Sequence, residues 1–285
     1  MRYVFMRYPE GRAKAVTFSY DDGVLQDVRL AELFYKRGLK ATFNMSSERL
    51  RPRNFTAEEI EENFFAKGHE VAIHGALHRA SGSIRAIEGI REVLDNRLEL
   101  EEKCGRLIRG MAYPDTGITR LNNISSYAEI KQYLTELDIA YARTLAGDND
   151  EFALPTDFHA WMPSAHHTNP ALGEYVEKFL SIDTSVGVYR ARRESRLLYI
   201  WGHSYEFDRD ENWEMFEEIC DKLAGREEIW YATNIEIYDY VTAYRRLVYS
   251  ADGRRIYNPT LLEVWFDVDG KLYSIKPGET LVIRE

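Results

Sequence analysis

The clearest strand pattern in the chain is Ala15-Val16-Thr17-Phe18-Ser19-Tyr20, and Asp21-Asp22-Gly23 ends it. Apolar residues then recur at helical spacing from Leu25 to Phe34, and Gly38 is the type of residue that closes a helix. A strand followed directly by an amphipathic helix is the repeating unit of α/β proteins. We therefore expect residues 15–38 to form the first βα unit of a parallel sheet.

The same unit recurs along most of the chain. Further strands are expected at residues 40–45, 69–74, 107–113, 139–145, 197–201 and 229–233. Helices are expected between them at residues 56–68, 84–103, 125–137, 170–181, 212–223 and 235–244. About seven βα repeats favour a barrel over an open sheet.

The pattern changes near residue 245. Asp252-Gly253, Asp269-Gly270 and Pro277-Gly278 are turn signals, and the runs between them alternate in polarity. We predict two regions: residues 1–245 form the barrel, and residues 246–285 form a β-hairpin appendage packed on it.

Composition narrows the class of protein. The chain has 285 residues, 45% hydrophobic and 29% charged, with a net charge of −10. These values are ordinary for a globular protein, and the negative charge argues against nucleic acid or an anionic membrane as partner. No apolar run approaches the roughly 20 residues that span a bilayer, and the N-terminus lacks the apolar segment of a secretory signal. We therefore expect a cytoplasmic protein, with an extracellular one as the alternative if a signal peptide has been removed. Aromatic residues reach 13%, which fits either core packing or a surface for stacking on sugars.

Two motifs carry candidate chemistry. Asp21 and Asp22 end a strand, where adjacent side chains point in different directions, although Asp-Asp-Gly is also an ordinary turn. His74-Gly75-Ala76-Leu77-His78 places two imidazoles four residues apart, which on a helical turn converge on one ion; a structural histidine pair is the alternative. Gly75 occupies the position where a zinc-protease helix needs Glu, which disfavours a metalloprotease.

The positions of the two motifs indicate that they form one site. Both lie at the carboxyl ends of expected parallel strands, where a barrel has its active-site mouth. One Asp with two His forms an open three-ligand zinc site, and the other Asp is then free to act as a base. Trp201-Gly202-His203 ends a later strand and adds an imidazole at the same rim.

These motifs, with Tyr113-Pro114 at another strand end, resemble the ordered motifs of the polysaccharide deacetylases, which carry the NodB homology domain and form carbohydrate esterase family 4. The resemblance covers about residues 13–245 and implies a distorted (β/α)7 barrel. It implies one divalent ion, most simply Zn²⁺, held by Asp22, His74 and His78; cobalt, nickel and manganese accept the same ligands. It makes Asp21 the general base and His203 the general acid. The substrate-binding positions that follow from it are Tyr113, Asp115, Trp161 and Trp201.

The chain departs from the family pattern at several positions. The family's Arg-x-Pro-aromatic motif aligns with residues 112–115, where Ala112 replaces the arginine; Arg109 is a candidate substitute. Asp157 and Trp161 are the nearest match to the partner motif. Gly75 replaces the usual Ser or Thr between the two His ligands, which removes a loop hydrogen bond. Two further features are open: His166-His167 is interpreted as structural or as part of the rim, and Glu206 either orients His203 or is solvated.

The resemblance predicts a hydrolase that removes acetyl groups from an N-acetylated (or O-acetylated) carbohydrate. A second hypothesis keeps the metal site but cleaves another C–N bond, of the cyclic ureide or formamide type, because the arginine is missing at position 112. A third is a non-catalytic carbohydrate-binding protein, which the aromatic content and the β appendage would suit.

Overall fold

A computed structural model of the protein describes residues 3–48, 54–122, 124–145, 149–184 and 193–283. Its centre is a curled sheet in which every pair of neighbouring strands is parallel. In spatial order the sheet contains β6 (Tyr141–Arg143), β5 (Gly110–Ala112), β4 (Glu70–Ile73), β3 (Ala41–Met45), β2 (Lys14–Asp22), β8 (Arg196–Gly202) and β7 (Ala165–His166). The predicted α/β fold of the distorted (β/α)7 barrel type is thereby confirmed.

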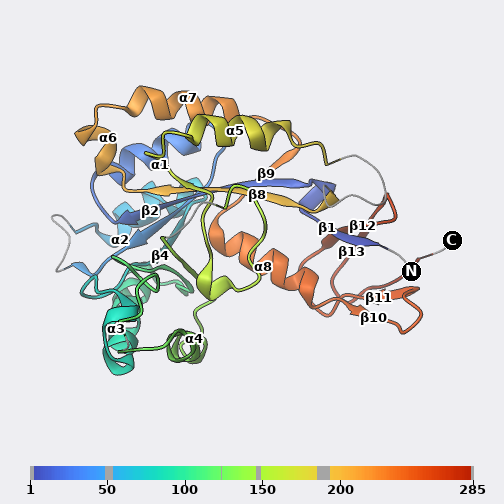
Figure 1. Cartoon of the computed structure of the whole chain (residues 1–285), viewed down its shortest axis with the longest axis horizontal. Coiled ribbons are helices and arrows are strands. Elements are labelled where there is room, and N and C mark those ends of the chain that lie inside the picture. Colours follow the sequence, from blue (N-terminus) through green and yellow to red (C-terminus); the bar gives the residue numbers. More distant parts are fainter. Residues whose placement is uncertain (1–2, 49–53, 123, 146–148, 185–192, 284–285) are drawn as a thin grey trace.

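Helices cover the outside of this sheet (Figure 1). One group packs above the sheet in the figure: α1 (Gln26–Lys36), α5 (Leu172–Ser181), α6 (Tyr205–Arg209) and α7 (Trp213–Leu223). The others are α2 (Ala57–Asn63), α3 (Ala86–Cys104), α4 (Tyr127–Glu136) and α8 (Asn234–Arg245). Short 3₁₀ turns are η1 (Pro9–Gly11), η3 (Phe65–Lys67), η4 (Ser81–Ser83) and η5 (Phe158–Ala160). A capping box between Thr56 and Glu59 begins α2.

The barrel closes differently from the sequence prediction. The expected seventh strand, β9 (Ile229–Tyr231), pairs only with the start of β2. The gap between β6 and β8 is spanned instead by residues 161–167: Trp161 bridges Arg143 of β6, and β7 pairs with β8. A strand of two residues is too short to show alternation in the sequence, so the sequence predicts no strand here.

Helix α8 closes the end of the barrel where the strands begin. Its first turn meets a buried polar network at the starts of β3 and β4. The Glu70 carboxylate accepts hydrogen bonds from the Thr42 hydroxyl (2.8 Å), the Tyr141 hydroxyl (2.7 Å) and the backbone N–H of Ile235 (2.9 Å). Burial raises the pKa of Glu70 to about 7.

Two small antiparallel sheets lie at the end of the molecule where both termini are found (Figure 1). One contains β1 (Val4–Arg7), β12 (Val264–Val268) and β13 (Lys271–Ile275); the other contains β10 (Val248–Tyr249), β11 (Arg255–Tyr257) and β14 (Thr280–Val282). Because β1 pairs with β12, the start of the chain shares a sheet with residues 264–275. The division at residue 245 stays a prediction.

Cys104 and Cys220 are both free thiols. No helix in the described part of the chain combines the length and apolar character needed to cross a lipid bilayer.

Candidate active site

The carboxyl ends of β2, β4 and β8 bring the predicted chemical groups together. Oδ1 of Asp22 lies 3.6 Å from Nε2 of His74 and 3.5 Å from Nε2 of His78. Tetrahedral zinc with bonds of about 2.0–2.1 Å separates its ligand atoms by about 3.3–3.4 Å. These three side chains are therefore spaced as ligands of one ion, and the set fits the metal that the family implies.

His74 is oriented by its surroundings. Its Nδ1 lies 3.1 Å from the carbonyl oxygen of Ala112, and its backbone N–H donates to Asn96. A carbonyl can only accept, so Nδ1 carries the proton and Nε2 presents its lone pair toward Asp22. This is the arrangement that metal-bound histidines ordinarily show.

His78 reaches the site through a loop, and the expectation of a helical turn was wrong. Gly75 has φ +86° and His78 has φ +54°, so the chain turns through the left-handed region. The Glu92 carboxylate of α3 holds this loop by accepting from the Leu77 N–H (2.8 Å) and from Nε of Arg79 (2.7 Å). A Cβ at position 75 would lie 3.0 Å from Glu92 Oε2. Glycine thus suits the turn, and Glu92 fixes the loop in which we expected a missing hydrogen bond.

Asp21 is 1% exposed and has two strong partners. Asn44 donates to Oδ1 (2.9 Å), and the guanidinium of Arg143 forms an ion pair with Oδ2. Arg143 is fully buried, and its guanidinium lies 4.2 Å from the ring centre of Trp201.

Arg143 also accounts for the arginine that is missing from position 112. Ala112 of β5 and Arg143 of β6 are register partners in the parallel sheet. Arg143 therefore places a guanidinium on the neighbouring strand, at the level of position 112. Arg109 does not take this role, because it pairs with Asp239 of α8 at the start of β5.

The charges of the site follow from these contacts. Burial alone would raise the pKa of Asp22, but the hydrogen bond from His78 and the charge of His74 lower it to about 2. Burial lowers the pKa of His74. The carboxylate of Asp22 is thus ionised and the His74 imidazole neutral at neutral pH, which are the states that bind metal.

His203 follows β8 and lies on the other side of the site. Its Nδ1 is 3.4 Å from Oε2 of Glu206, which is buried rather than solvated. The same oxygen lies 3.3 Å from Nε2 of His166 and 3.3 Å from Nε2 of His167. Burial opposes protonation of His203, but Glu206 and the aspartates Asp21 and Asp22 outweigh it and raise the pKa.

The remaining predicted residues are distributed around this centre. Tyr113 is buried and donates its hydroxyl hydrogen to the carbonyl of His159 (2.9 Å). Asp115 is exposed and close enough to His78 to raise its pKa, after the larger effect of the Asp22 hydrogen bond and against burial. Trp161 is buried against Tyr141, whereas Trp201 contacts Arg143.

Asp157 does not meet an arginine of the site. Its carboxylate accepts hydrogen bonds from Tyr127 (2.8 Å) and Lys131 (2.7 Å) of α4. Asp27, which the sequence did not single out, accepts from the hydroxyl of Ser204 (2.6 Å), and burial raises the Asp27 pKa to about 8. This contact ties the first turn of α1 to the residue after His203.

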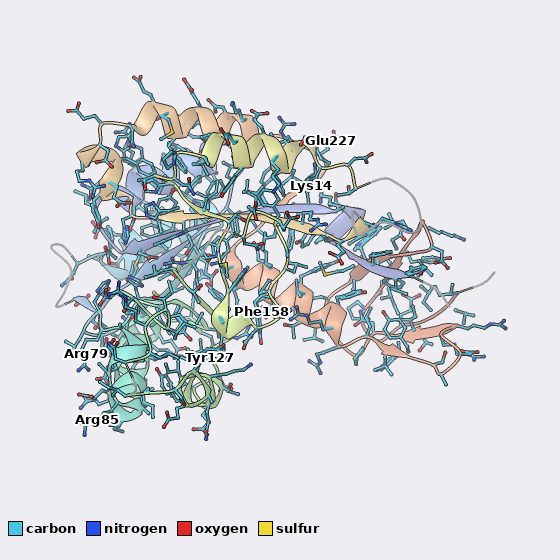
Figure 2. The ribbon with its side chains drawn as sticks, in the orientation of Figure 1. Lys14, Arg79, Arg85, Tyr127, Phe158 and Glu227 are labelled. Carbon is cyan, nitrogen blue, oxygen red and sulfur yellow. The ribbon has the colours of Figure 1, made fainter. Side chains whose placement is uncertain are left out.

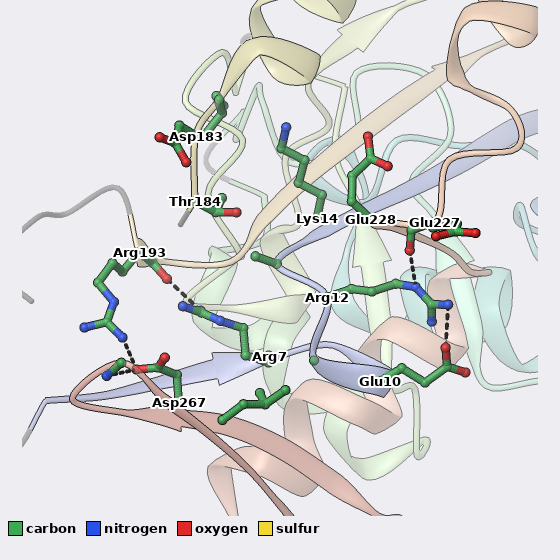
Figure 3. Close-up of a pocket in the computed structure, with 15 residues that line it drawn as sticks. Arg7, Glu10, Arg12, Lys14, Asp183, Thr184, Arg193, Glu227, Glu228 and Asp267 are labelled. Carbon is green, nitrogen blue, oxygen red and sulfur yellow. Dashed lines mark hydrogen bonds and ion pairs between the residues drawn. The ribbon is translucent and has the colours of Figure 1, made fainter. Parts of the chain in front are cut away.

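A separate pocket of about 720 Å³ lies at the opposite end of the sheet (Figure 3). Figure 2 shows its lining residues Lys14 and Glu227 far from Arg79, which marks the loop of His78. Charged residues that line this pocket bind one another. Arg193 forms an ion pair with Asp267, and Arg12 forms an ion pair with Glu10 and donates a hydrogen bond to the carbonyl of Glu227. None of the motif residues lines it.

Comparison with known proteins agrees with this geometry. The family model described as polysaccharide deacetylase matches residues 8–133. No curated protein matches the chain. Solved structures with the same fold include a Mycobacterium smegmatis protein assigned as a polysaccharide deacetylase (16% identity, 86% of this chain and 96% of that one, TM-score 0.58). A second is the Xyl-CE4 domain of a multidomain xylanase from the hindgut metagenome of Trinervitermes trinervoides (14% identity, 81% of this chain and 92% of that one, TM-score 0.52). A third is the chitin deacetylase of Colletotrichum lindemuthianum (16% identity, 81% of this chain and 89% of that one, TM-score 0.50).

Residues 8–133 match the polysaccharide deacetylase family, as the motifs predicted. The direct match contains the motifs at Asp21-Asp22 and at His74 to His78, whereas His203 lies beyond it.

Proposed function

We propose that the protein is a metal-dependent hydrolase that removes acetyl groups from an N-acetylated (or O-acetylated) carbohydrate. The observation that carries the proposal is the convergence of an Asp-His-His ligand set with a second buried aspartate and an imidazole. Asp22, His74 and His78 would hold one divalent ion, most simply Zn²⁺. Such an ion, when bound, lowers the pKa of a coordinated water and polarises the carbonyl of the acyl group.

The protein's own groups would move the protons. Asp21 would accept the proton of the attacking water, and the ion pair with Arg143 fixes the direction in which its carboxylate points. His203 would donate a proton to the leaving nitrogen or oxygen, so that the C–N or C–O bond breaks to give acetate and a free amine or hydroxyl. Glu206 lies against Nδ1 of His203, which leaves Nε2 for the substrate.

Arg143 bears on the competing hypothesis. The ureide or formamide hydrolase was favoured by the missing arginine at position 112, and Arg143 supplies that charge from the adjacent strand. Trp201 beside Arg143, with an exposed fraction of 8%, is the aromatic residue of the site best placed to line a sugar subsite.

The proposal is tested by acetate release from N-acetylglucosamine oligomers and from O-acetylated xylan. Asp21→Ala and His78→Ala should lower the rate by about 10²-fold or more. Asp239→Ala is the matched control, because it also removes an aspartate paired with an arginine but at the far end of the barrel.

Equal release by wild type, Asp21→Ala and His78→Ala would refute the mechanism. Activity on cyclic ureides or formamides without acetate release would favour the second hypothesis. Glycan binding without either activity would favour the non-catalytic protein.

A further inference from the structure

A second cluster of ligand-type side chains lies beside the first. His166 ends β7, His167 follows it, and Glu206 lies on α6, the short helix that follows β8 and is labelled at the upper left of Figure 1. Nε2 of each histidine is 3.3 Å from the same oxygen, Oε2 of Glu206. The three ligand atoms all lie within 4.8 Å of one another.

Hydrogen bonds account for only part of this cluster: Nδ1 of His166 bonds to the Thr168 hydroxyl (2.7 Å), and Glu206 Oε2 accepts the backbone N–H of His203 (3.3 Å). Nε2 of each histidine stands 3.3 Å from Glu206 Oε2, longer than the usual N–H···O length of about 2.9–3.0 Å. His167 is 1% exposed, yet neither of its ring nitrogens has a hydrogen-bond partner within the described part of the chain. A buried imidazole with two unsatisfied nitrogens is costly unless something else occupies the space before it.

The separations do fit a metal ion. Ligands at about 2.0–2.1 Å from a tetrahedral centre stand about 3.3–3.4 Å apart, which is the spacing of Glu206 Oε2 from both imidazoles. Two imidazoles and one carboxylate are ligands for zinc and neighbouring transition metals rather than for calcium or magnesium.

The position of His167 is fixed by its packing. Its ring stacks between Tyr20 (centroids 5.6 Å apart, 15° between planes) and Phe207 (4.2 Å, 25°). A Cβ at position 202 would overlap the His167 imidazole, so Gly202 makes room for it. His166 is placed edge-on to Trp201 (4.5 Å, 87°). The cluster is therefore preorganised, and Gly202 of the motif before His203 has a defined steric role.

We propose that His166, His167 and Glu206 bind a second divalent transition-metal ion, of the zinc class, separate from the ion of Asp22, His74 and His78. Three protein ligands leave one coordination position open. Because Glu206 Oε2 also lies 3.4 Å from Nδ1 of His203, this carboxylate would be shared between the second ion and the proposed acid. The second site does not depend on the proposed function.

The test is metal content after chelator treatment and reloading with zinc, measured per chain by elemental analysis. We expect two ions in wild type, one in His167→Phe, one in His78→Ala and none in the double variant. Phenylalanine keeps the stacking between Tyr20 and Phe207 but removes both nitrogens. His159→Gln alters an imidazole outside both clusters and should keep two ions. Thermal unfolding of each variant shows that it is folded.

Cobalt gives a second readout, because tetrahedral Co²⁺ absorbs visible light strongly. The spectrum of the cobalt-loaded wild type should lose one component in His167→Phe and a different one in His78→Ala. One ion in wild type that His167→Phe retains and His78→Ala loses would overturn the second site while supporting the proposed active site. Two ions in His78→Ala would instead count against the active site.

Discussion

The ion pair between Arg143 and Asp21 gives the sharpest prediction. Arg143→Ala leaves a carboxylate that is 1% exposed, with the Asn44 amide as its remaining side-chain hydrogen-bond donor among the described residues and the His74 imidazole 3.8 Å away. Removing one member of a buried ion pair costs about 3–5 kcal/mol, because the remaining charge is uncompensated. This is a large part of the roughly 5–15 kcal/mol that stabilises a typical domain.

Activity should fall with the same change. The loss is limited by what removal of the base itself would cost, which is about 10²–10⁴-fold, and we expect kcat/KM to fall by about 10²-fold. The free energy of unfolding is measured by urea titration followed through tryptophan fluorescence, and kcat/KM by acetate release.

The informative variant exchanges the two residues. Ala112 and Arg143 are register partners on adjacent parallel strands, so their side chains point to the same face about 4.8 Å apart at the backbone. Arg143→Ala combined with Ala112→Arg should therefore restore the ion pair with Asp21 and recover most of the lost stability and rate. Wild-type stability and rate in Arg143→Ala would refute the role of the pair. A folded double variant no more active than Arg143→Ala would refute the equivalence of the two positions.

Three further changes test other parts of the molecule. The pKa of Glu70 is about 7 in the folded protein and about 4.5 in the unfolded chain, so the folded state holds the proton more strongly. The free energy of unfolding should therefore fall by about 3 kcal/mol as the pH rises from about 4.5 to about 7. Glu70→Gln should flatten this decline in urea titrations at pH 5 and 8. Gly202→Ala should destabilise the fold by at least about 1–3 kcal/mol and release the second ion, whereas Gly173→Ala, with open space around it, should be neutral or slightly stabilising in thermal melts. Glu92→Gln should weaken zinc at the first site by about 10–100-fold in chelator competition and leave the second site unchanged; equal weakening of both sites would contradict the local role of Glu92.

The parts of the site that the sequence predicted are those encoded by short contiguous motifs at the ends of strands. The strand from Ala15 to Tyr20 alternates and ends in Asp21-Asp22-Gly23, and the observed β2 includes both aspartates. Parallel strands present their carboxyl ends on one edge, so motifs that follow separate strands must converge there. That rule alone brought Asp22, His74 and His203 to one region.

The parts that the sequence did not predict depend on register and on backbone conformation. Nothing near Arg143 marks it as a partner of Asp21, since the contact spans 122 positions and rests on which strand lies beside β5. His78 needs a positive φ, which spacing does not encode. β7 is two residues long and pairs with β8, while Trp161 before it bridges Arg143 of β6, so no pattern of its own identifies this segment.

The sequence motifs thus locate the candidate metal ligands, but they do not locate the residues that hold the site in place. Asp22, His74 and His78 occupy positions that the family motifs name. Arg143 and Glu92, which hold the base and the metal loop, come from a neighbouring strand and a helix that carry no motif. We expect an arginine on either β5 or β6 to reach Asp21, because positions 112 and 143 are register partners on adjacent strands. The constraint acts on the position of the guanidinium, not on the position of arginine in the chain, and the Ala112–Arg143 exchange measures that difference directly.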